Sequence, residues 1–314
     1  MKEEFHQSEN LSIELLRELS KKCSLPSLKR FALQYLVLIA SLLTLLFGES
    51  GSFVCFLAIS VFGFSSMAMF AVGHETIHKT AFVSPLLNDL VCFLACFPVF
   101  HTPTGFRYFH FAHHHFTHNL NKDPEISVMG KQTPGLLSSL WIYISYLSGM
   151  PLMLAKMSIT LAGAIGAGGL TKKYLWYVPA DKWARLRWES CLVIAAQALL
   201  VTLFISYDRL SVLMIAQIVG HSMLSLYIFA EHNLLPNEGT ILERTRTMRY
   251  GPFINNLMWN MPYHAEHHAF PSVAWHALPR LHKAMNHELV NQEFSLFHVH
   301  SQALKQIKRA SRSA

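Results

Sequence analysis

Four long apolar stretches constrain the fold of this chain more than any other feature of its sequence. They are Phe31–Phe47, Phe53–Val72, Cys191–Ser206 and Ser211–Ala230. About 20 mostly apolar residues are enough for a helix to cross the hydrocarbon core of a bilayer, and flanking side chains can shorten that requirement. With 52% hydrophobic and only 14% charged residues, the chain is also too apolar for an ordinary soluble domain. The sequence therefore predicts an all-α multi-pass membrane protein with four transmembrane helices.

The short polar loops "GESGS" and "YDRL" join these stretches into two hairpins. Lys and Arg indicate how the hairpins are oriented, because cytoplasmic segments carry an excess of them. The two hairpin tips together carry one, Arg209, whereas residues 1–30 carry six, 73–190 carry ten and 231–314 carry nine. We expect both termini and a histidine-rich helical cap to face the cytoplasm, in a bacterial inner membrane or the endoplasmic reticulum. The net charge of +7 reflects this bias and not a nucleic-acid surface, since the basic residues form no single aromatic-interleaved patch.

Three regions follow from this topology. Residues 1–30 are predicted to be a cytoplasmic amphipathic segment without a cleavable signal peptide, either lying on the membrane surface or forming a solvated helix. One face of it carries Leu11, Leu15 and Leu19. Residues 31–290 form the predicted integral membrane domain, and residues 291–314 a basic C-terminal tail.

Two further apolar stretches, Leu86–Phe100 and Trp141–Leu170, are interrupted by proline or charge and are expected in or on the cytoplasmic interface. The five cysteines lack the spacing of a disulfide framework or a metal site, so we interpret them as buried thiols in a reducing setting.

Histidine is the residue type that carries chemistry here, with 19 residues of 314. One cluster is "HETIH", with His74 and His78. The other two are His-x-x-His-His triplets, with His110, His113 and His114 in one and His264, His267 and His268 in the other. On a helix, residues i, i+3 and i+4 share a face, so each triplet is expected to direct three imidazoles at one point.

All three clusters fall on the same side of the predicted membrane. Eight imidazoles are too many for one tetrahedral zinc and suit two metal ions, although imidazole alone does not identify the metal. His232, in "FAEHN" at the end of the fourth span, lies at the same level and is a ninth candidate.

A zinc protease is the competing interpretation of "HETIH", with Glu75 as the general base. The chain contains no Asp-Gly turn to supply the acidic third ligand, and a protease leaves both triplets unexplained. We therefore expect Glu75 to orient an imidazole. Other candidates for that role are Asp123, Glu125, Glu231 and Glu266. The second cluster also allows a frame in which His115 or His118 is a ligand.

Taken together, His-x-x-x-His followed by two His-x-x-His-His boxes on four spans resembles the membrane fatty acid desaturase superfamily. The stretch "WNMPYHAEHHAFPSVAWHALPRLH" is similar to the third box of its acyl-lipid desaturase branch, and the resemblance covers Val72–His282. It implies two iron ions in a non-haem di-iron centre that uses O₂ and two electrons to place a double bond in a lipid acyl chain. Its implied ligands are His74, His78, His110, His113, His114, His264, His267 and His268, with His232 as the extra ligand.

Two alternatives remain open at this stage. A hydroxylase or ketolase acting on alkyl chains or carotenoids would use the same site. A metal-binding transporter is disfavoured because the spans hold almost no ionisable residue except His221, which we expect to bond a backbone carbonyl. The sequence has no His-Pro-Gly-Gly haem motif and no cysteine set for an iron–sulfur cluster, so a separate ferredoxin, cytochrome or reductase is expected to donate electrons. Four further histidines, His276, His282, His298 and His300, lack the spacing of the boxes and are interpreted as surface or tail residues.

Overall fold

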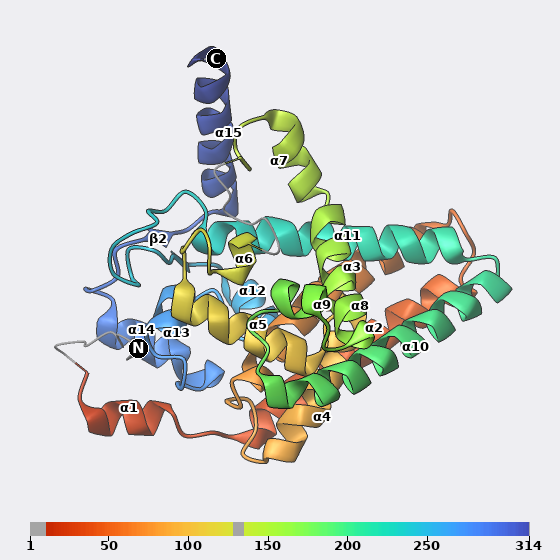
Figure 1. Ribbon diagram of the computed structural model, residues 1–314, viewed down its shortest axis with the longest axis horizontal. Helices are drawn as coiled ribbons and strands as arrows, with labels where there is room; N and C mark the ends of the chain where they lie inside the picture. Colours follow the sequence, from red (N-terminus) through yellow and green to blue (C-terminus); the bar gives the residue numbers. More distant parts are fainter. Residues whose placement is uncertain (1–10, 128–134, 314) are drawn as a thin grey trace.

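The computed structural model describes residues 11–127 and 135–313, and helices dominate these ranges (Figure 1). Four helices are long and apolar enough to cross a membrane: α2 (Ser24–Phe47), α3 (Phe53–Ile77), α10 (Trp183–Ser206) and α11 (Leu210–His232). Each contains one of the four predicted stretches, which confirms the all-α multi-pass fold. The helices extend beyond the apolar runs, because backbone hydrogen bonding does not stop where the side chains become polar.

The two tips of these helix pairs lie together at one end of the molecule. The Phe47 and Tyr207 rings meet edge to face with centroids 5.2 Å apart, and the Arg209 guanidinium donates to Ser50 Oγ. The opposite ends of the same helices carry His74 and His232. The α2–α3 loop and the α10–α11 loop therefore lie on one side of the predicted membrane, and the histidines lie on the other.

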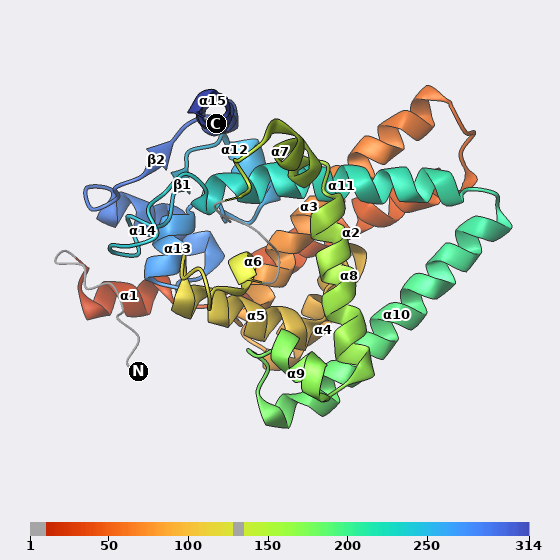
Figure 2. The same cartoon turned by 45° about the horizontal axis from the view of Figure 1, so that its top comes forward.

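The second helix pair is an open hairpin. Near its tip α10 meets α11, but the two helices then diverge, and α8 (Met150–Ile165) lies between them (Figure 2). The main partner of α11 is α3. At this contact a Cβ added to Gly63 would lie 2.9 Å from Val219 Cγ1, so the absence of a side chain lets the helices approach closely.

The two interrupted apolar stretches form bent helix pairs. The first consists of α4 (Pro85–Cys96), η1 (Phe97–Val99) and α5 (Pro103–Phe116), and bends by 88°. The second consists of α7 (Leu140–Leu147) and α8, and bends by 60° at Gly149. Gly149 has φ +73° and its position would place a Cβ 2.3 Å from the backbone of His221, which no other residue tolerates. The location of both pairs at the membrane interface stays a prediction.

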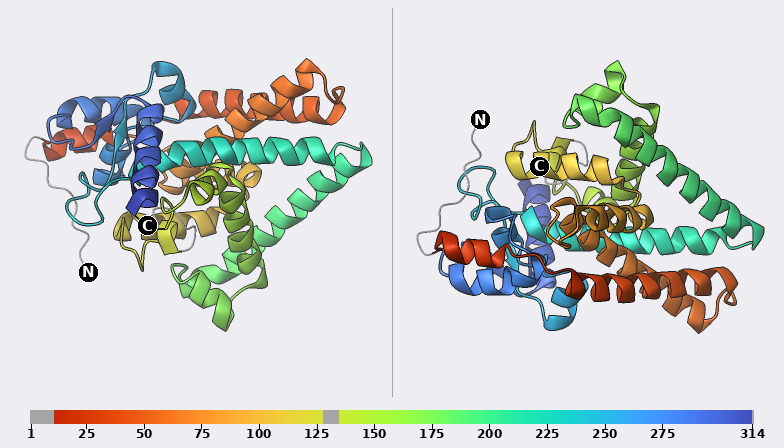
Figure 3. Two further views of the ribbon diagram at one scale, coloured as in Figure 1. Left: turned by 90° about the horizontal axis from the view of Figure 1, so that it is seen from above. Right: turned by 90° about the horizontal axis from the view of Figure 1, so that it is seen from below.

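The remaining elements are short and most of them gather beyond the histidine ends of the spans (Figure 3). Two parallel strands pair there, with Thr247 opposite Gln292 and Met248 opposite Glu293. In chain order the elements are α1 (Ile13–Leu19), α6 (Pro124–Ser127), α9 (Gly169–Tyr174), η2 (Ala180–Lys182), β1 (Thr247–Met248), α12 (Pro252–Leu257), α13 (His264–Ala269), η3 (Trp275–Ala277), α14 (Leu278–Met285), β2 (Gln292–Glu293) and α15 (Leu296–Ser313).

The terminal segments both pack onto this cap. Leu19 of α1 is buried against α14, and Arg280 binds Glu18 with an N–O distance of 2.8 Å. In α15 the buried face is formed by Val299, Ala303 and Ile307, which join a cluster with residues of α7 and α11. The described part of residues 1–30 is thus neither free in solvent nor detached from the protein.

Cysteine burial differs from the expectation in part. All five thiols are free, but only Cys55, Cys92 and Cys96 are buried. Cys23, just before α2, and Cys191, on α10, are exposed. The apolar stretch around Cys191 faces outward in part, so it does not imply a protein core at that position.

Candidate metal centre

Helix α5, which carries the second cluster, is anchored at its start. Helix α5 begins with Pro103, and Thr102 Oγ1 accepts from Gly105 N at 3.2 Å. The buried Glu189 of α10 accepts from Thr104 N at 2.7 Å and from Thr104 Oγ1 at 3.0 Å. These contacts fix the start of α5, so its later turns project the second cluster toward the end of α3.

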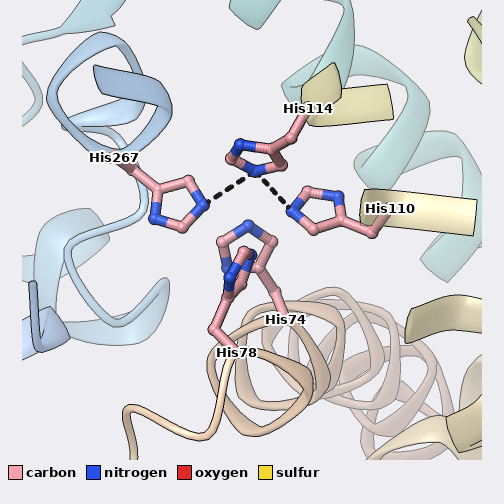
Figure 4. A group of neighbouring side chains, drawn as sticks. All are labelled: His74, His78, His110, His114 and His267. Atoms are coloured by element: carbon pink, nitrogen blue, oxygen red, sulfur yellow. Dashed lines mark hydrogen bonds between the residues drawn. The ribbon is translucent and has the colours of Figure 1, made fainter. Parts of the chain in front are cut away.

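The structure brings all nine predicted histidines together as two separate groups. Within each group, one ring nitrogen from every residue lies within 4.8 Å of the others. The first group (Figure 4) is His74, His78, His110, His114 and His267. The second group is His113, His232, His264 and His268. Their role as metal ligands is an expectation that the proposal below takes up.

The expectation that each triplet points at a single centre is wrong. In the second cluster, His110 and His114 join the first group while His113 joins the second. In the third cluster the division is reversed, since His267 alone joins the first group. Residues i+3 and i+4 lie about 100° apart around a helix, so only the i and i+4 rings converge and the i+3 ring turns toward a different point.

The second group offers a direct test of whether these residues fit a metal ion. His113 Nδ1 donates to Asp123 Oδ1 at 3.0 Å, and His232 Nδ1 donates to the Arg244 carbonyl at 3.2 Å. In the neutral rings each Nε2 therefore carries a lone pair. These two Nε2 atoms are only 3.1 Å apart, and His264 Nε2 is 2.8 Å from that of His232. Lone pairs at such distances repel unless a cation lies between them.

The first group also contains buried ring nitrogens that can accept a proton or a metal ion but have no hydrogen-bond donor in the part of the chain that the structure describes. His74 Nδ1 donates to Glu75 Oε1 at 3.1 Å, which leaves its Nε2 as the acceptor. Among the described residues this buried Nε2 and that of His78 have no hydrogen-bond partner. His114 Nε2 lies 2.9 Å from His110 Nε2 and 3.1 Å from His267 Nε2. Adjacent nitrogen ligands of one ion at a typical bond length of about 2.1 Å lie about 3.0–3.4 Å apart. The residues present therefore fit one metal ion in each group.

The environment keeps these rings in the form that binds metal. Burial, reinforced by the neighbouring imidazoles, holds the pKa of both His267 and His268 well below the usual value. A neutral imidazole is the ligand form, so no proton must be displaced before a cation binds.

Carboxylates orient the rings at several points. Asp123 is fully buried and accepts from His113 with both oxygens, and its Oδ2 also accepts from His118 N at 3.0 Å. Glu231 Oε1 lies 3.6 Å from His264 Nδ1, and Glu125 Oε2 lies 3.8 Å from His113 Nδ1. Of these three carboxylates, Asp123 is within hydrogen-bond distance of a ring nitrogen and so favours the His113 tautomer with a proton on Nδ1.

Glu266 has a different position from the one expected. It accepts from His282 Nδ1 and from Thr247 Oγ1, each at 2.5 Å, and so links the third cluster to α14 and β1. The interpretation of His282 as a surface residue is therefore wrong. His300 lies in the predicted tail and is partly buried, with Nδ1 2.5 Å from the Tyr143 hydroxyl. Neither residue has a spacing to the boxes that would have revealed its contact.

Sequence reasoning also missed two arginines in the segment between α11 and β1. Arg244 Nη1 donates to the Thr117 carbonyl at 2.6 Å, while its own carbonyl holds His232. Arg246 N donates to the Glu231 carbonyl at 3.0 Å, and Arg246 Nη2 to the Asn233 carbonyl at 3.1 Å. These hydrogen bonds hold the segment between α11 and β1 beside the second group. No local sequence pattern predicts that the two arginines make these contacts.

The ambiguous histidines fall outside both groups. His115 is exposed on the far side of α5. His118 is buried beside His232, with ring centroids 5.4 Å apart, and burial lowers its pKa to about 4. His221 donates from Nδ1 to the Gln217 carbonyl at 2.8 Å, as expected for a neutral histidine within a span.

A helical fold with four potential spans and two facing groups of buried histidines defines a multi-pass membrane protein with a candidate dinuclear site. Comparison with known proteins agrees with this class. The fatty acid desaturase family model matches residues 50–300, and the chain belongs to that family. It is an integral membrane protein.

A similar relative is the sphingolipid delta(4)-desaturase of Candida albicans. The two chains are 24% identical over 230 residues, which cover 69% of this chain and 58% of the relative. The match thus covers little more than half the length of that relative.

Proposed function

We propose that this protein is an O₂-dependent membrane desaturase that introduces a double bond into the acyl chain of a lipid. The observation that supports this most strongly is the pair of histidine groups, five and four residues, whose donor atoms converge at two neighbouring points. The family match supports the class of reaction. We assign the nine histidines as ligands of two iron ions.

The two iron ions, when bound, would supply the activation of O₂ that removal of hydrogen from an unactivated chain requires. Overall, –CH₂–CH₂– loses two hydrogen atoms and becomes –CH=CH–. O₂ accepts these two hydrogen atoms together with two electrons and two protons, and is reduced to two water molecules. The protein contributes positioning and shielding. Asp123 and the Arg244 carbonyl hold two rings with Nε2 directed into the second group. Burial of the rings keeps bulk water from the reacting atoms.

Desaturation is favoured over hydroxylation or ketolation as the outcome. The histidine groups alone suit either, because both begin with removal of the same hydrogen. The relative from Candida albicans is a desaturase. The third box of this chain, "WNMPYHAEHHAFPSVAWHALPRLH", also resembles that of acyl-lipid desaturases. The name of that relative also makes the long-chain base of a sphingolipid a substrate to test beside fatty acyl chains.

The electrons are proposed to come from a separate ferredoxin, cytochrome or reductase. The histidine groups and the cap are proposed to face the cytoplasm, where such donors are located. The Lys and Arg distribution supports this orientation, since the two tips on the opposite side carry only Arg209.

Expression in a host that lacks the product, followed by mass spectrometry of total fatty acids and long-chain bases, tests the activity. The wild type should yield a product 2 mass units lighter than its precursor, with no label incorporated from ¹⁸O₂. His114→Ala should abolish it, whereas His115→Ala, the adjacent exposed histidine, should leave it unchanged. A labelled alcohol or ketone would instead establish the hydroxylase or ketolase alternative.

A further inference from the structure

An apolar groove lies away from the histidine groups, on the outer face of the first helix pair. It is a groove of about 780 Å³ between α2, α3 and α12. Its walls are apolar and open to the surroundings: Leu33 is 66% exposed, and Phe64 and Phe253 are exposed as well. In a membrane protein such a surface lies against lipid.

The end of the groove nearest the cap is cationic. Lys29 and Arg30 line it there, and no Asp or Glu occurs among its lining residues. Arg30 is held in place, since Nη2 donates to Asn256 Oδ1 at 2.7 Å and the guanidinium stacks over Trp275 at 4.2 Å. Beside it, Lys29 is exposed. A guanidinium held in a fixed position next to an exposed ammonium forms a cationic end that is suited to an anionic headgroup.

The length of the groove matches one leaflet. It extends along α2 from Lys29 to Val37, and eight residues of helix rise about 12 Å. Half of a hydrocarbon core is about 15 Å thick. Acyl chains that lie against Val37 and Val61 would therefore place a headgroup at the level of Lys29 and Arg30.

We propose that this groove binds a single phospholipid with an anionic headgroup, drawn from the leaflet on the histidine side of the membrane. The anionic headgroup faces Lys29 and Arg30, and the acyl chains follow the groove between α2 and α3. The site is distinct from the candidate metal centre, and the proposal stands independently of the reaction that the centre carries out.

Native mass spectrometry of the delipidated full chain in detergent tests this site. The chain is titrated with phosphatidylglycerol or phosphatidylcholine of identical acyl chains. Each basic side chain near an anionic lipid contributes about fivefold in affinity, so Lys29→Gln should weaken phosphatidylglycerol binding about fivefold. Phosphatidylcholine binding should weaken less, because the choline cation offsets the charge of its phosphate. Lys172→Gln, an exposed cation of α9 outside the groove, is the matched control and should change neither.

A second variant tests the apolar part without touching the charges. Val37→Trp fills the groove from a position that is already 39% exposed, and it should weaken both lipids. Equal affinity of the wild type for the two lipids would overturn the assignment of an anionic headgroup. Unchanged binding in both Lys29→Gln and Val37→Trp would overturn the site itself.

Discussion

Individual residues of α5 show how one helix serves two groups at once. His110 and His114 face one group, His113 faces the other, and His115 faces away from both. Eight of the nine histidines were predictable because the box spacing is independent of the tertiary fold, and His232 from its position at the end of the fourth span. Their division was not, since it depends on how α5 and α13 are rotated relative to α3, and on contacts such as Glu189 with Thr104 that span distant parts of the chain.

Asp123 is expected to affect metal binding indirectly, through its hydrogen bond with the His113 ring. We expect Asp123→Asn to preserve the shape of the site but to lower metal affinity at the second group by about 10-fold to 100-fold, because the charged acceptor of the His113 ring is lost. Competition with a chelator of known affinity measures this. Asp181→Asn, an exposed carboxylate on η2, is the control. Equal metal affinities in both variants would count against an orienting role for Asp123.

Among the elements, the contact between α3 and α11 links the two groups, since α3 carries His74 and α11 carries His232. Gly63→Leu should force these helices apart, because even a Cβ there lies 2.9 Å from Val219. Overpacking of this kind costs about 1–3 kcal/mol and should lower the thermal midpoint in detergent. Gly251→Leu, where nothing lies within 4 Å of the added Cβ, should not. A midpoint unchanged by Gly63→Leu would show that the helices do not meet there.

The spans themselves were predictable, because hydrophobic length alone identifies them. The 60° bend at Gly149 and the insertion of α8 between α10 and α11 were not. An apolar run broken by Pro151 and Lys156 does not reveal whether it crosses, bends or lies flat, and that outcome depends on the space left by its neighbours.

For the whole molecule, we expect the two hairpin tips to be accessible from outside the cell and the cap to be accessible only from the cytoplasm. In a variant with Cys23 and Cys191 replaced by serine, Ser50→Cys should react with a membrane-impermeant thiol reagent in intact cells. Gln306→Cys, exposed on α15, should react only after the membrane is opened. The reverse pattern would place the histidine groups outside the cytoplasm and contradict the proposed orientation.

The central claim is that two metal ions are held by the two histidine groups, and counting metal per chain tests it most directly. The number of metal ions per chain is more informative than the identity of the metal, because zinc competes with ferrous iron for nitrogen ligands during expression. The account predicts two ions in the wild-type protein and in His115→Ala, and a loss from the corresponding group in His114→Ala and in His264→Ala. A single ion that survives both of these substitutions would contradict it, since binding would then depend on neither group as described.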